Sequence, residues 1–183
     1  ESERLHRLVE DLLVLTRAER GAFAVEAEPL ELRRVITRVV ERERRRMPGL
    51  EITTDLPRGL PVVAGEETYV EQIIRNMLSN AAKYTPIGSH VVVRAEQEGD
   101  VVAIRILDDG PGIDPASAER AFELFYRDPD TSRMVAGSGI GLFVCRELVA
   151  TMGGRIWAKP LEGRGAEFGF SIPAYVDELD LGP

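Results

Sequence analysis

Apolar residues recur every three or four positions in several stretches of the chain, which is the spacing of one helix face. This period predicts long helices over residues 1–20, 29–47, 66–84 and 140–152, and a short helix is expected over residues 116–125. The third helix stops before Pro86, which cannot continue it. Residues 127–138 show no apolar period and contain Asp, Pro, Ser and Gly, so we expect a mobile loop there.

Short apolar runs between the helices, bounded by glycine, proline or polar turns, predict strands. They cover residues 50–56, 62–64, 90–97, 101–107, 155–159 and 166–172. A turn through Gly99 and Asp100 joins one pair, and residues 162–165 join the last pair, so both pairs should form hairpins. Helices mixed with mostly antiparallel strands predict an α+β domain whose sheet is covered on one face by helices.

The first predicted helix has a narrow apolar stripe with the spacing of a helix that pairs with another helix. Val9 and Leu13 widen this stripe, and Gly21 follows the helix as a C-terminal cap. The stripe consists of Leu5, Leu8, Leu12 and Leu15. We favour half of a helical hairpin that pairs with another chain, and packing on the domain's own body is the alternative.

The composition is that of an ordinary globular domain, with 183 residues, of which 44% are hydrophobic and 30% charged. A formal net charge of −8 argues against nucleic acid as a partner. The single cysteine, Cys145, excludes an internal disulfide and is expected to be a buried thiol. The apolar runs are too short to span a bilayer, so no membrane contact and a cytoplasmic location are expected. Because the chain begins at Glu1, we expect a fragment of a longer protein, in which a membrane anchor can lie elsewhere.

Three glycine clusters mark a candidate ligand site, at residues 108–112, 137–141 and 163–165. Glycine lets the backbone approach a ligand closely. The second cluster also precedes a predicted helix, whose free N–H groups favour phosphate. The P-loop pattern does not fit, because no cluster supplies its Gly-Lys-Ser/Thr. The Rossmann fingerprint does not fit either, because Leu142 stands where its last glycine would be. Three tight turns remain the alternative.

Two asparagines, Asn76 and Asn80, lie one turn apart at the edge of the apolar arc of helix 66–84, with Lys83 beside them. The arc consists of Val70, Ile74, Met77, Leu78 and Ala81. An amide oxygen is a suitable ligand for Mg²⁺, and lysine meets phosphate as a point charge. Taken alone, this set also fits the polar flank of an amphipathic helix.

Four motifs in this order resemble the ATP-binding catalytic domain of sensor histidine kinases, within the wider fold shared with gyrase, Hsp90 and MutL. Residues 76–86 resemble the N box of this family, and residues 108–113 resemble its first glycine box. Residues 122–127 resemble its F box, and residues 137–142 resemble its second glycine box. The resemblance covers residues 29–173. It implies a Bergerat-type two-layer α/β sandwich, preceded here by one long helix.

The resemblance also implies binding of ATP with Mg²⁺. Asp108 would accept a hydrogen bond from the adenine amino group, and Asn80 would hold the metal. The implied catalytic residues are Asn76, Asn80 and Lys83, and residues 114–136 would form a lid over the nucleotide. The other implied nucleotide contacts are Tyr84, Gly110, Gly112, Ile113, Tyr126, Arg127, Arg133, Gly137, Ser138, Gly139, Ile140, Gly141 and Leu142.

Asn76 favours transfer of phosphate over its hydrolysis. The gyrase-like hydrolases carry a glutamate at this position to orient water, and a neutral amide cannot act as a general base. The implied function is therefore transfer of the γ-phosphate to a histidine. An ATP hydrolase of the gyrase class and a non-catalytic ATP-sensing module are the alternatives.

The phosphoacceptor of this family is a histidine on the first hairpin helix, and neither His6 nor His90 has its sequence context. We expect it on a helix absent from this chain, so the fragment should bind ATP but not phosphorylate itself. The implied partners are that helix, the receiver domain of a response regulator, and a second copy in a homodimer formed through the N-terminal helix. Ala166 replaces the family's usual Thr or Ser and puts adenine affinity in doubt.

The expected organisation has three parts. Residues 1–22 would be the second hairpin helix, residues 23–175 the catalytic domain and residues 176–183 a tail.

Overall fold

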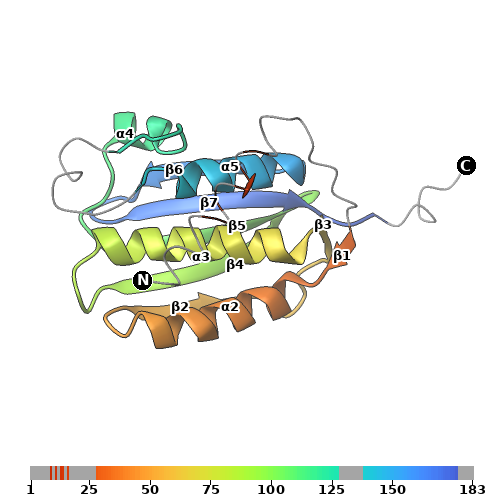
Figure 1. Ribbon diagram of the computed structural model, residues 1–183. Coiled ribbons are helices and arrows are strands. Elements are labelled where there is room, and N and C mark those ends of the chain that lie inside the picture. Colours follow the sequence, from red (N-terminus) through yellow and green to blue (C-terminus); the bar gives the residue numbers. More distant parts are fainter. Residues whose placement is uncertain are drawn as a thin grey trace, which may run out of the picture.

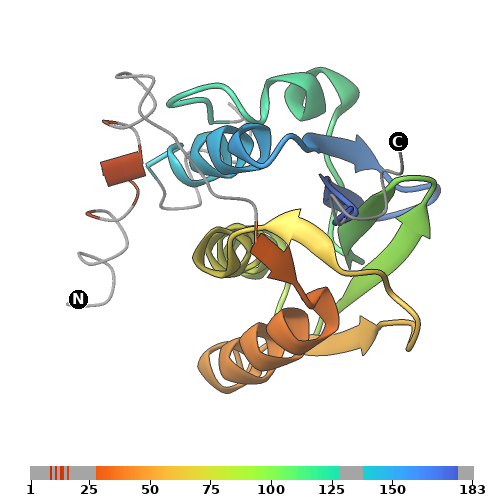
Figure 2. The same cartoon turned by 90° about the vertical axis from the view of Figure 1, so that its right-hand side faces the viewer.

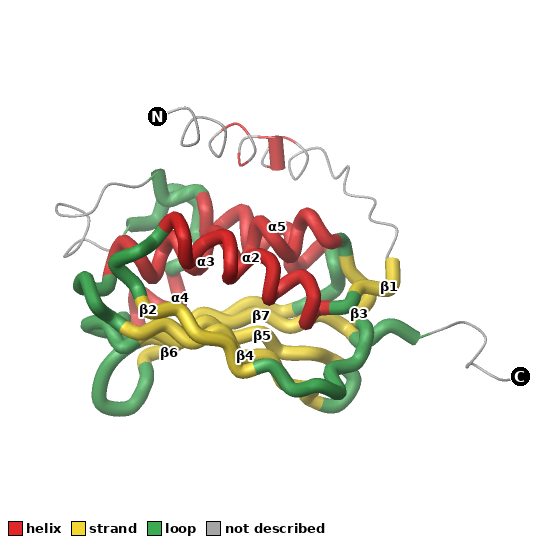
Figure 3. Tube along the Cα trace, turned by 90° about the horizontal axis from the view of Figure 1, so that it is seen from below, coloured by secondary structure: helices red, strands yellow, loops and turns green. Residues whose placement is uncertain are grey.

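The structure, a computed structural model, describes residues 28–127 and 138–176 together with residues 9, 11, 13, 14 and 16. Helices form one layer and a five-stranded sheet the other (Figures 1 and 3). The elements are, in chain order, β1 (Glu28–Leu30), α2 (Leu32–Arg46), β2 (Glu51–Asp55), β3 (Val63–Gly65), α3 (Glu67–Tyr84), β4 (His90–Glu98), β5 (Val101–Asp108), α4 (Pro115–Arg120), α5 (Gly141–Thr151), β6 (Arg155–Pro160) and β7 (Ala166–Pro173).

The main sheet has the strand order β2-β4-β5-β7-β6. β2 runs parallel to β4, and the other neighbouring pairs are antiparallel. Both predicted hairpins, β4–β5 and β6–β7, are therefore confirmed, and so is the mixed, mostly antiparallel sheet. β1 and β3 form a separate antiparallel pair. The helix predicted over residues 29–47 wrongly included most of β1, which has no apolar alternation because only Leu30 of its three residues is buried.

Helices α2, α3 and α5 lie side by side on one face of the sheet (Figure 2). α3 lies between the other two and carries the site described below. Its predicted apolar arc is buried throughout. Both carboxylate oxygens of Glu66 accept backbone N–H groups at its start, from Thr68 and Tyr69. On the solvent side, Arg38 of α2 pairs with Glu67 and Glu71 of α3.

The core lies between this helix layer and the inward face of β4, β5 and β7. Phe170 and Ile104 are fully buried on the sheet side. On α5, Cys145 is fully buried, as predicted for a structural thiol, and burial raises its pKa. His90 is exposed at the start of β4 and shares a hydrogen bond with Thr53.

The helix predicted over residues 116–125 is shorter in the structure, where α4 ends at Arg120. Asp114 caps its start by accepting the N–H groups of Ala116 and Ser117. The predicted end was wrong because the chain continues after Arg120 in turns, where the N–H of Glu123 donates to the carbonyl of Arg120, and Phe125 then takes a left-handed φ of 63°. A helix cannot continue through that conformation.

The described N-terminal residues are helical, with Asp11 and Val14 buried. Val9 and Leu13 are 48% and 53% exposed. The leucine stripe, His6 and Gly21 lie outside the described residues, as does most of the predicted loop at 127–138. Within the part of the chain that the structure describes, no helix has the length and apolarity needed to cross a membrane.

Replacing buried Ile74 of α3 by alanine should lower the free energy of unfolding by about 2–5 kcal/mol, because a cavity would open beneath the site helix. Ile87→Ala is the matched control, since that side chain is 93% exposed and should change stability by less than about 0.5 kcal/mol. Urea denaturation followed by circular dichroism measures both. Equal losses would contradict this account of the core.

Candidate nucleotide-binding site

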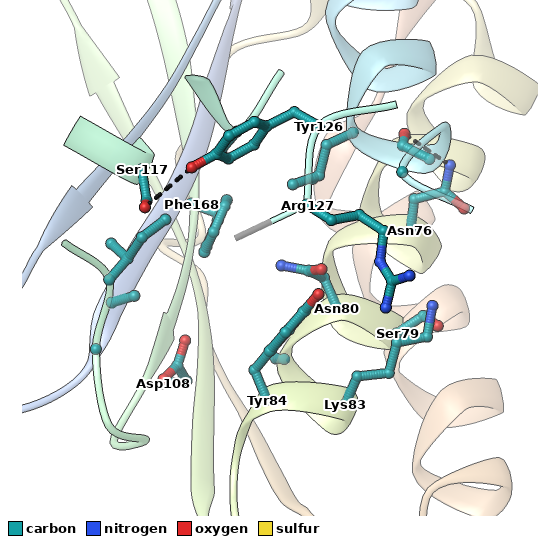
Figure 4. Close-up of a pocket in the computed structure, with 18 of the residues that line it drawn as sticks. Asn76, Ser79, Asn80, Lys83, Tyr84, Asp108, Ser117, Tyr126, Arg127 and Phe168 are labelled. Carbon is teal, nitrogen blue, oxygen red and sulfur yellow. Dashed lines mark hydrogen bonds between the residues drawn. The ribbon is translucent and has the colours of Figure 1, made fainter. Parts of the chain in front are cut away.

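A cavity of about 620 Å³ opens between α3, the β5–α4 connection and the start of α5 (Figure 4). Most residues predicted for a nucleotide site line it: Asn76, Asn80, Lys83, Tyr84, Asp108, Gly112, Ile113, Tyr126, Arg127, Ser138, Gly139, Gly141 and Leu142. Gly110 and Ile140 do not line it, although their N–H groups donate to Asp108 and Ser138, which do. Arg133 and Gly137 lie outside the described residues. The structure thus brings together side chains that the sequence places far apart.

One end of the cavity holds the buried carboxylate of Asp108, at the last position of β5. It accepts the N–H of Gly110 at 2.9 Å and a second backbone N–H, from Ala166. Burial raises the pKa of Asp108, although these two donors oppose the rise. A carboxylate held in this way can accept a hydrogen bond from an amino group in the cavity.

The first and third glycine clusters are in contact beside Asp108. A Cβ on Gly165, whose φ is 100°, would lie 1.9 Å from the carbonyl oxygen of Asp108. A Cβ on Gly112, with a φ of 90°, would lie 3.1 Å from the carbonyl oxygen of Gly165. Arg164 adds a hydrogen bond to the carbonyl of Gly110 at 3.1 Å. This close packing requires glycine at both positions, and Gly112 lines the cavity with backbone alone.

The other end of the cavity is cationic. Asn80 and Lys83 of α3 and Arg127 from the F box extend into the same part of it, and Asp108 lies apart from them (Figure 4). The N-terminus of α5 borders the cavity at Gly141, where its free N–H groups favour an anion. This end therefore fits a polyphosphate.

Asn76 holds the two helices of the cationic end together. Its amide nitrogen donates to the carbonyl of Gly141 at 3.2 Å, so that α3 is tied to the first residue of α5. This bond uses a side-chain N–H, which a glutamate carboxylate at this position would not offer.

The F box and the second glycine box are also in contact. The N–H of Phe125 donates to the carbonyl of Gly139 at 3.0 Å. A Cβ on Gly139 would come within 3.0 Å of the backbone of Phe125 and Tyr126, so glycine is required there. The hydroxyl of Tyr126 donates to Ser117 at 3.1 Å (Figure 4). The Arg120 guanidinium lies 4.4 Å from the centre of the Tyr126 ring.

A divalent cation at the cationic end would need ligands from the nucleotide. Among the described residues, no three His, Cys, Asp or Glu side chains gather into a metal site. Asn80 lines the cavity beside the cationic groups, so a cation there would complete its shell with phosphate oxygens and water, as Mg²⁺ commonly does.

Several lining residues were not predicted from the sequence. Ser79 lies within the N box and Ser117 within the predicted lid, but neither was singled out, and Phe168 belongs to no motif. Asp11 also lines the cavity, and its distance along the chain from every motif left no signal for it.

Comparison with known proteins agrees with this geometry. A model of the family described as "Histidine kinase-, DNA gyrase B-, and HSP90-like ATPase" matches residues 65–176, and the chain belongs to this family. Sensor histidine kinase WalK of Bacillus subtilis (strain 168) is 32% identical over 184 residues, which cover 98% of this chain and 30% of WalK. The adaptive-response sensory kinase SasA of Thermosynechococcus vestitus is 33% identical over 178 residues, covering 96% of this chain and 47% of SasA.

Among solved structures, full-length ShkA in complex with AMPPNP superposes with a TM-score of 0.81 at 29% identity. The match covers 95% of this chain and 36% of the ShkA chain. The resemblance to the ATP-binding domain of sensor histidine kinases is thereby confirmed, together with the fold. This chain spans less than half the length of WalK and SasA.

Gly165→Ala should abolish nucleotide binding, because the added Cβ would displace the Asp108 backbone. Gly163→Ala is the matched control: it has a similar φ of 85° but nothing within 4 Å of its Cβ. That control should lose only about 1–2 kcal/mol of stability through backbone strain. Titration calorimetry measures binding and thermal melting measures stability. Full nucleotide affinity in Gly165→Ala would rule out the role given to this contact.

Acid should weaken the binding of adenosine at a pH above the range where an ordinary aspartate titrates, because burial raises the pKa of Asp108. Below that pKa the neutral carboxyl is a poorer acceptor, and affinity should fall by up to about tenfold per pH unit. Adenosine is the probe because it has no phosphate to titrate. Asp108→Asn should bind weakly at every pH, and a wild-type affinity that does not change with pH would exclude this role.

Proposed function

We propose that this chain is the ATP-binding catalytic part of a two-component sensor kinase that transfers the γ-phosphate of Mg-ATP to a histidine. The proposal rests on the difference in chemical character between the two ends of one cavity. An acceptor for an amino group, Asp108, lies at one end, and Asn80, Lys83 and Arg127 gather at the other. An adenine base joined to a phosphate chain has the matching polarity.

Each group in the cavity has a definite part in holding the nucleotide. Asp108 would accept a hydrogen bond from the adenine amino group, and Gly112, which has no side chain, would let the ring approach. Asn80 would bind Mg²⁺, while Lys83 and Arg127 would neutralise phosphate charge. Bound Mg-ATP supplies the phosphoryl group. The protein's contribution is to orient the phosphate chain and neutralise its charge.

Asn76 supports transfer over hydrolysis. Its side chain is neutral, and its amide donates to the carbonyl of Gly141, so it holds α5 in place and has no basic group with which to activate water. The acceptor is then a group brought to the cavity by another element. We place the acceptor histidine on a helix outside this chain, with a response regulator receiver domain as the next acceptor.

The described N-terminal residues support a division of the chain into a hairpin helix (residues 1–22), a catalytic domain (residues 23–175) and a tail (residues 176–183). Val9 and Leu13 are a helical turn apart and both largely exposed. An apolar pair of this kind fits the seam of a paired helix in a homodimer. The whole protein would act in the cytoplasm, where ATP is available.

Mixing this chain with γ-labelled ATP and a separate peptide domain that carries the hairpin with its histidine should transfer label to the histidine. Lys83→Ala should reduce transfer at least about tenfold, because one phosphate contact is lost. Lys159→Ala is the matched control, since this lysine lies on β6 and pairs with Glu167.

Acid-labile, base-stable label on the added hairpin would support the kinase, and the chain alone should stay unlabelled. Brisk release of free phosphate, with or without the hairpin, would instead indicate a hydrolase. Binding of ATP without either reaction would indicate an ATP-sensing module.

A further inference from the structure

The side chain of Arg164 joins the third glycine cluster to the first. Its Nε donates to the carbonyl of Gly110 at 3.1 Å, and 54 positions separate the two residues in the sequence. Arg164 lies in the turn between β6 and β7, which is closed by a hydrogen bond from the N–H of Leu161 to the carbonyl of Gly165 at 3.0 Å. Arg164 does not line the cavity, so its effect on a ligand has to pass through Gly110.

Gly110 lies where three parts of the site meet. A Cβ there would lie 2.6 Å from the Cγ2 of Thr85 and 2.8 Å from the Oδ1 of Asp108. Thr85 caps the end of α3, and its hydroxyl donates to the carbonyl of Ala81 at 2.8 Å, which fixes the position of its methyl group. Gly110 is therefore packed between the end of α3 and the Asp108 carboxylate, and Arg164 binds it from the β6–β7 turn.

Gly110 also connects the two parts of the chain that form the base end of the cavity, which is the end that holds Asp108. Asp108 lies on one side and accepts the N–H of Gly110 at 2.9 Å, while Pro111 and Gly112 line the cavity on the other side. Glycine has no Cβ to restrict its backbone dihedrals, whereas proline has a fixed φ and no N–H. If Arg164 released the carbonyl, Gly110 could rotate, and the donor to Asp108 and the backbone at Gly112 would shift together.

We propose that Arg164 is a positioning residue for the base end: by binding the carbonyl of Gly110, it keeps Asp108 and the backbone of residues 111–112 in the arrangement that accepts an adenine ring. The proposal deepens the proposed function and rests on it, because adenine is the part of ATP assigned to this end. The hydrogen bond from Nε produces the effect, and the positive charge of the guanidinium is not required. Arg127 differs in this respect, since it lines the cationic end and would meet phosphate directly.

Two variants of similar shape separate the hydrogen bond from the charge. Arg164→Gln places its Nε2 where the arginine has Nε, so it keeps a donor for Gly110 and loses the charge. Arg164→Met places a methyl group there and keeps neither. Calorimetry at about 0.15 M salt, where distant charges are screened, should show adenosine and ATP bound about three- to tenfold more weakly by Arg164→Met and with wild-type affinity by Arg164→Gln. Arg155→Met, on β6 and exposed, is the matched control and should leave both affinities unchanged.

The pH dependence of adenosine binding gives a second readout. Burial raises the pKa of Asp108 and the charge of Asp109 adds to the rise, whereas the N–H groups of Gly110 and Ala166 oppose it. Weakening the Gly110 bond in Arg164→Met should raise this pKa further, so adenosine affinity should begin to fall at a higher pH than in the wild type. Arg164→Gln should keep the wild-type midpoint. Thermal melting of both variants checks that the fold is retained.

The outcomes separate this proposal from the proposed function. Wild-type affinity for adenosine in Arg164→Met would overturn the role of Arg164, while the nucleotide site would stand. Equal losses in Arg164→Gln and Arg164→Met, or a loss confined to ATP, would assign the effect to charge and also overturn it. Weaker binding by Arg164→Met with an unchanged pH midpoint would reduce Arg164 to a structural residue. Failure of the wild-type chain to bind either ligand would overturn the proposed site and the role of Arg164 together.

Discussion

Helix α3 has to satisfy two environments at once, and the rest of the structure is arranged around that requirement. One face buries Ile74 and Met77 among the helices and the sheet, while the adjoining edge carries Asn76 and Asn80 into the cavity. The helical repeat puts both sets on one rigid element, so the packing of the core also fixes the polar side chains. A change that shifts α3 within the core would therefore move the phosphate end of the site, and stability and binding share the same contacts.

The cavity gives an acidic domain a local region suited to an anion. The chain carries a net charge of −8, yet Lys83, Arg127 and the start of α5 gather at one end of the cavity. Asp108 occupies the other end, where a base needs an acceptor and no phosphate has to lie. The cavity thus offers an acceptor for a base at one end and positive charge for phosphate at the other. The hydrogen bond from Asn76 to Gly141 joins α3 and α5, the two helices of the cationic end.

Features with a repeating pattern could be predicted from the sequence, and contacts between distant segments could not. The apolar arc of α3 and both hairpins followed from spacing, and the glycine motifs pointed to a ligand. β1 was missed because a three-residue strand has no period, and α4 was overextended because the left-handed turn at Phe125 leaves no apolar signature. The bonds from Gln72 to Asp11 and from Arg164 to Gly110 exist only in the folded chain.

The contact between Phe125 and Gly139 pins two ends of a chain segment at a fixed distance from each other. Once two ends are joined, the entropy cost of closing the chain between them grows only slowly with its length, by about 0.6 kcal/mol for each doubling. Insertions or deletions between Arg127 and Ser138 should therefore cost little stability, whereas Tyr126, Arg127 and Ser138 themselves line the cavity. The Phe125–Gly139 contact thus separates the conformation of the cavity walls on either side from the length of chain that joins them.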